Sequence, residues 1–78
     1  MFWLCYKING QICVVIQAAE SLQHARLKAE IAHETLPSSG FTEGHRLDPP
    51  TIRRIPKKLT GKLLCQADAR KLLDLIDA

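Results

Sequence analysis

The sequence has few aromatic residues and lacks every motif that would identify a reaction or a ligand. Aromatic side chains make up 5% of the 78 residues, and three of the four lie at positions 2, 3 and 6. There is no Cys-x-x-Cys pair and no phosphate-binding Gly-Lys-Ser/Thr loop. We therefore predict no cofactor, no metal site and no small-molecule substrate, and we expect a protein that is not an enzyme.

The three cysteines, Cys5, Cys13 and Cys65, cannot all pair within one chain because their number is odd. The N-terminus lacks a basic region followed by a long apolar run and a cleavage site. No apolar run approaches the ~20 residues that span a bilayer. We therefore expect a cytoplasmic protein without membrane contact, whose cysteines are reduced and act as small apolar residues.

What the chain does contain is the composition of a small globular protein, with 46% hydrophobic and 24% charged residues. Residues 1–78 are long enough for one domain. A core of this size supplies only roughly 3–5 kcal/mol of net stability. A partner, a dimer interface or a metal would therefore help the fold.

The dipeptide Asn9-Gly10 favours a two-residue β-turn, because both central positions of a type I′ turn need positive φ. A turn at this point predicts a β-hairpin over about residues 2–17. It also fixes the register, in which Phe2 pairs with Gln17.

Both faces of the predicted hairpin are apolar, whereas a surface hairpin would alternate apolar and polar residues. One face carries Phe2, Leu4, Tyr6, Ile8, Cys13 and Val15. The other face carries Trp3, Cys5, Ile12, Val14 and Ile16. We expect the C-terminal third of the chain to cover the second face. Alternatively, a homodimer covers it, with Trp3, Ile12, Val14 and Ile16 as the self-association face.

Helical patterns flank the middle of the chain. Ser21 is a natural N-cap, and small apolar residues at three- and four-residue spacing predict a helix over about residues 21–34. A second apolar stripe, which ends at Ile76, predicts a C-terminal helix over about residues 66–77. The first helix is expected to pack on the hairpin.

Residues 37–50 are rich in turn formers, and we predict a long flexible loop there. A short third strand around residues 42–47 would pair with the hairpin edge and shield it. Asp48 and Pro49 could begin a short helix as its cap and first residue, and Pro56 would end it.

The net charge of +3 is concentrated in one part of the chain. Residues 46–62 hold six basic side chains and one acidic side chain. Such clustering favours an anionic partner, since Lys and Arg neutralise phosphates and release counterions. The candidate contacts are Arg53, Arg54, Lys57, Lys58 and Lys62. No known nucleic-acid-binding motif accompanies them.

The sequence thus predicts a small α+β protein. Its leading functional interpretation is a non-catalytic intracellular binding or accessory protein that contacts nucleic acid, or an acidic protein surface, through residues 53–62. The alternative is a protein-protein interaction module that self-associates through the apolar hairpin face. A metal-dependent or thiol enzyme, assembled from dispersed Cys, His and carboxylate residues, ranks third.

Overall fold

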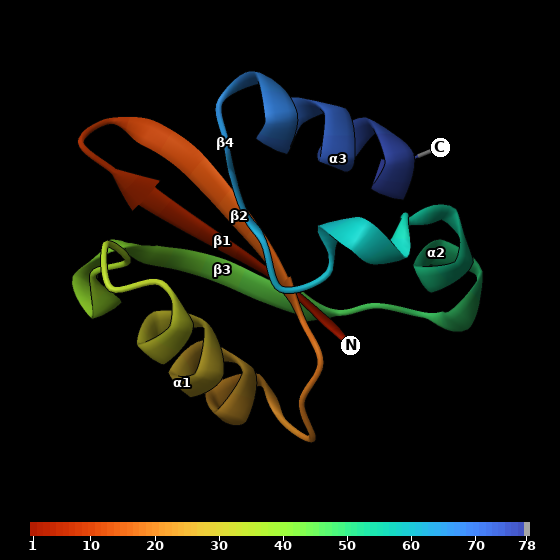
Figure 1. The fold of residues 1–78 in the computed structure, drawn as a ribbon, viewed down its shortest axis with the longest axis horizontal. Coiled ribbons are helices and arrows are strands. Elements are labelled where there is room, and N and C mark those ends of the chain that lie inside the picture. The colour runs from red at the N-terminus through yellow and green to blue at the C-terminus, as the bar shows by residue number, and fades with distance from the viewer. Residues whose placement is uncertain (78) are drawn as a thin grey trace.

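The computed structural model describes residues 1–77 and shows one antiparallel sheet between two helical layers (Figure 1). The strands are β1 (Phe2–Ile8), β2 (Gln11–Gln17), β3 (Phe41–Arg46) and β4 (Leu63–Cys65), in the spatial order β3-β1-β2-β4. The helices are α1 (Leu22–Ala32), α2 (Pro49–Arg54) and α3 (Ala67–Asp77). The predicted α+β class is confirmed.

The hairpin forms in the register that the turn predicts, from Phe2 opposite Gln17 to the turn itself. Asn9 and Gly10 have φ values of 50° and 81°, as the left-handed turn positions require. All later packing depends on this register, because a slip of one residue would exchange the two faces.

The first face of the hairpin is covered by α1. The hydroxyl of Ser21 accepts a hydrogen bond from the backbone N–H of His24 at 3.2 Å, which confirms the predicted N-cap. The helix ends earlier than predicted, at Ala32, because His33 leaves the helical conformation with φ −122° and ψ 88°. The core on this side consists of Phe2, Leu4, Tyr6, Val15, Ala25, Ala29 and Leu36.

The second face is covered by α2 and α3, so the C-terminal third of the chain provides the second cover (Figure 1). The buried core on this side consists of Trp3, Cys5, Val14, Ile16, Leu47, Ile55, Ala69 and Leu72. A second protomer is therefore not required to bury the hairpin.

The middle of the chain has more regular structure than a loop. Residues 38–40 form a 3-10 turn, and β3 then pairs antiparallel with β1, which confirms the predicted third strand. Asp48 caps α2 by accepting from the N–H of Thr51 at 3.1 Å. The flexibility of residues 37–50 stays a prediction.

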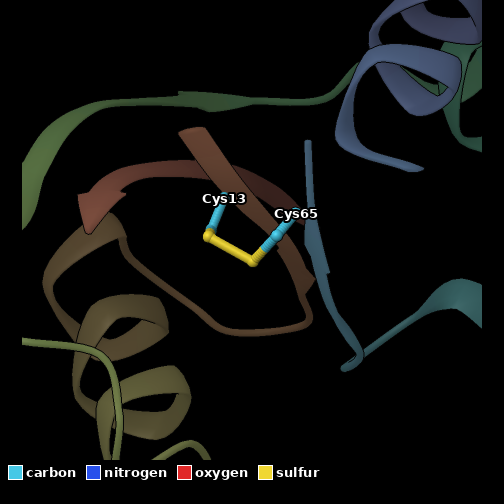
Figure 2. The surroundings of a disulfide bond; sticks show 2 residues. All are labelled: Cys13 and Cys65. Atoms are coloured by element: carbon cyan, nitrogen blue, oxygen red, sulfur yellow. A yellow bond between two sulfur atoms is a disulfide. The ribbon is translucent and has the colours of Figure 1, made fainter. Parts of the chain in front are cut away.

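A disulfide joins Cys13 to Cys65, so the expectation that all cysteines are reduced is wrong for these two (Figure 2). The bond forms because β4, a strand that the sequence did not indicate, places Cys65 directly opposite Cys13 of β2. Cys5 lies on the other face of the sheet as a buried free thiol, in agreement with the register.

Candidate functional site

The predicted basic contacts lie on a single connection, residues 53–62, which we call the basic segment. Arg53 and Arg54 end α2, Lys57 and Lys58 begin a 3-10 turn, and Lys62 precedes β4. All five side chains are exposed. The five cations thus lie along one exposed stretch of chain that runs from the end of α2 to the start of β4.

The backbone of the basic segment is tied to its surroundings. The N–H of Gly61 donates to the carbonyl of Ile16 at 2.7 Å, beside a bridge between Ile16 and Thr60. The ring of His33 hydrogen-bonds the carbonyl of Gly61 at 2.8 Å. These hydrogen bonds hold the backbone of the segment in place near Gly61, so the side chains of its cations project from an anchored backbone.

Most cations of the basic segment have no carboxylate partner among the described side chains. The two ion pairs in residues 1–76 join Arg26 to Glu30 and His45 to Glu43, both outside the segment. Arg54 differs from the others because its guanidinium donates to the hydroxyl of Thr51 at 3.2 Å. The positive charge of the remaining four is available to an anion.

A mostly apolar pocket of about 340 Å³ adjoins the segment. It is lined by Met1, Ile16, Ile52, Arg53, Ile55, Lys57 and Thr60. Two cations therefore stand beside an apolar hollow, an arrangement that suits a ligand with both a charged and an apolar part.

The predicted self-association face lies mostly in the interior. Trp3, Val14 and Ile16 are buried beneath α2 and α3, while Ile12 near the hairpin turn is 49% exposed. Only Ile12 of these four presents a large apolar surface to another molecule in this conformation.

A cleft of about 490 Å³ beside Trp3 was not predicted from the sequence. Its lining residues come from β1, β3, α2, α3 and the β3–α2 connection: Trp3, Glu43, His45, Arg46, Leu47, Asp48, Thr51, Leu73 and Ile76. The imidazole of His45 stacks on the indole of Trp3, with 5.3 Å between ring centroids. The available signal in the sequence was the only tryptophan of the chain, which lies on the second apolar face of the predicted hairpin.

Two carboxylates, those of Glu43 and Asp48, border the cleft. Hydrogen bonds from Thr51 lower the pKa of Asp48, and the nearby positive charge of Arg54 lowers it further. The carboxylate of Glu43 lies 3.4 Å from the His45 ring and is largely exposed. Arg46 also lines the cleft, but its guanidinium lies over the Phe2 ring, which belongs to the opposite face of the sheet.

A cluster of polar side chains also lies between α1 and the sheet. The hydroxyl of Tyr6 donates to Glu30 at 2.6 Å, and Ser38 and Arg26 also donate to this carboxylate. Burial alone would raise the pKa of Glu30, but the hydrogen bonds from Ser38 and Tyr6 and the charge of Arg26 together lower it. Tyr6 has no exposed surface, so its hydroxyl ties α1 to the sheet, while Arg26 and Glu30 remain partly exposed.

Within residues 1–76, no group of three or more His, Cys, Asp or Glu side chains is arranged to hold a metal ion. Among the described helices, none is both long and apolar enough to cross a membrane. No family model, curated protein or solved structure matches the chain.

Proposed function

We propose that this is a small non-catalytic binding protein that contacts nucleic acid through the basic segment. The observation that supports this proposal is the set of four exposed cations, Arg53, Lys57, Lys58 and Lys62, without a described carboxylate partner on one anchored connection. Cations held in this way neutralise phosphates without paying for the loss of existing ion pairs. No aromatic side chain lies within residues 53–62, so the contact is expected to involve phosphates and to show little sequence preference.

The proposal places the protein with nucleic acid in the cytoplasm. Disulfides are rare in that reducing compartment, so the Cys13–Cys65 bond would be open to reduction there. Binding should therefore be compared in oxidised and reduced protein. The basic segment reaches β4 just before Cys65, so reduction is expected to weaken binding if it frees this end of the segment.

The test is fluorescence anisotropy with a labelled duplex and the matching single strand, measured over a range of salt concentrations. The affinity should fall steeply with salt, with a log–log slope of about −0.9 for each duplex phosphate that is neutralised. The double substitution Lys57→Glu and Lys58→Glu should weaken binding and flatten this slope.

Lys28→Glu together with Lys71→Glu is the matched control. It changes the net charge by the same amount at two exposed positions on α1 and α3, outside the basic segment. No binding at low salt, or equal weakening by both double variants, would contradict the proposal. Equally tight binding to poly-glutamate would identify an acidic protein surface as the partner in place of nucleic acid.

A further inference from the structure

The cleft beside Trp3 opens where α3 leaves part of the sheet uncovered. α3 packs mainly on β2, β4 and α2, so it lies over one half of the second face. Trp3 belongs to β1 and His45 to β3, on the other half. A cleft of about 490 Å³ falls within the range of small-ligand sites, roughly 300–1,000 Å³.

The same cleft borders a free strand edge. β3 has a strand neighbour on one side only, β1, and lies at the margin of the sheet (Figure 1). The N–H of Leu47 donates to the carbonyl of Met1 at 3.0 Å. Because hydrogen bonds alternate along an antiparallel ladder, the backbone groups of Gly44 and Arg46 then face away from β1. These groups are open to another strand.

The side chains beside this edge suit a cation. Glu43 and His45 are paired with Cys5 and Trp3 of β1, so they project on the same side as the cleft. Glu43 and Asp48 supply two carboxylates there, although the charge of Arg54 already acts on Asp48, and the indole of Trp3 supplies an aromatic surface. Carboxylates and an indole together attract ammonium and guanidinium groups.

Trp3 also lacks a hydrogen-bond partner. Its side chain is 7% exposed, and its Nε1 is the one described buried side-chain nitrogen or oxygen without a partner in residues 1–76. Buried indole N–H groups normally find an acceptor. His45, whose side chain is 62% exposed, stacks on the face of this indole and forms part of the cleft wall.

We propose that the β3 edge and the cleft bind an extended peptide segment of another protein that contains Lys or Arg. The peptide adds a strand to β3, its backbone bonding Gly44 and Arg46. Its alternate side chains point into the cleft, where the cation lies against Trp3, Glu43 and Asp48. This surface is separate from the basic segment and takes a partner of opposite charge.

The probe is the peptide acetyl-Thr-Val-Thr-Lys-Thr-Val-Thr-amide, compared with the same peptide carrying Glu in place of Lys. Trp3 is the only tryptophan, so its fluorescence reports on the cleft without any label. The Lys peptide should change this fluorescence and shift the NMR signals of the Trp3 indole N–H and the Gly44 amide. The Glu peptide should bind at least about tenfold more weakly, which corresponds to roughly 1.4 kcal/mol.

Charge-neutralising variants test the two carboxylates. Asp48→Asn keeps a good N-cap for α2, and Glu43→Gln keeps the length of the side chain. Together they should weaken binding of the Lys peptide by about tenfold or more. Glu20→Gln together with Glu34→Gln, at exposed positions on either side of α1, removes the same two charges elsewhere and should leave binding unchanged.

Three results would overturn the proposal. The first is no spectral change with the Lys peptide at millimolar concentration, and the second is equal binding of the Lys and Glu peptides. The third is a shift of the Gly44 amide that depends on protein concentration without any peptide, because it would assign the β3 edge to a second copy of this chain.

Discussion

The pKa of the buried Tyr6 side chain can be measured directly in solution. Burial and its hydrogen bond to Glu30 raise the pKa of Tyr6 from 10.0 to about 12. It is the only tyrosine of the chain, so tyrosinate absorbance follows it alone.

We expect the folded protein to titrate Tyr6 near pH 12, and the unfolded chain near 10. Because the folded-state pKa is the higher one, the stability linked to Tyr6 is fully present below pH 10 and is lost as the pH rises toward 12. Chemical denaturation at a series of pH values measures this loss. A midpoint near 10 in the folded protein would show that the hydroxyl is open to water.

For single residues, the sequence predicted which side chains are exposed better than it predicted where a binding cleft lies. The five basic side chains are exposed, as expected of charged residues in a turn-rich stretch. The cleft around Trp3 was not predicted, because its walls come from β1, β3 and α3, which lie far apart in the chain. A short stretch of sequence carries no signal for contacts between segments so far apart.

Among the elements, α1 follows most directly from local signals. Its N-cap and its buried stripe, Ala25 and Ala29, are both spelled out within one short stretch of sequence. Alanine side chains allow the helix to lie close to β1 and β2, whose facing residues are large. The stability of α1 should therefore depend measurably on its cap.

Ser21→Ala should lower the free energy of unfolding by about 1 kcal/mol, because the N–H of His24 loses its acceptor. Ser39→Ala is the control, since Ser39 is exposed in the 3-10 turn before β3 and makes no described side-chain hydrogen bond. Its effect should stay within about 0.5 kcal/mol. Urea denaturation measures the free energy of unfolding of both variants. Equal losses for the two would show that the Ser21 cap does not stabilise α1.

β4 escaped prediction for a different reason. It is only three residues long, Leu63–Cys65, and too short to show an alternating pattern. Its identity as a strand comes from its partner, β2, which lies about fifty residues earlier in the chain. Pairing at that distance is a tertiary event.

For the molecule as a whole, the Cys13–Cys65 disulfide fastens the C-terminal part of the chain to the hairpin. It links positions 52 residues apart, across neighbouring strands. A cross-link over a long loop restricts the unfolded chain strongly.

Denatured, unreduced protein should therefore contain one reactive thiol, from Cys5, and reduction should expose three. Reduction should also lower the free energy of unfolding by roughly 2–4 kcal/mol. The double variant Cys13→Ala and Cys65→Ala should show a similar loss and no further response to reductant. Three reactive thiols before reduction would mean that the bond does not form.

The sequence by itself determined the hairpin register and the starts of α1 and α2. These features depend on neighbouring residues, such as Asn9-Gly10 and Ser21, and local sterics and hydrogen bonding are enough to specify them. It also required that both faces of the hairpin be covered.

Only the tertiary structure decided what covers the second face, which cysteines pair and where a cleft remains. The C-terminal layer, the bond between Cys13 and Cys65, and the opening beside Trp3 all arise where segments distant in the chain meet. The hydrophobic effect demands burial but has no direction, so it could not choose between α3 and a second protomer until the whole chain had packed.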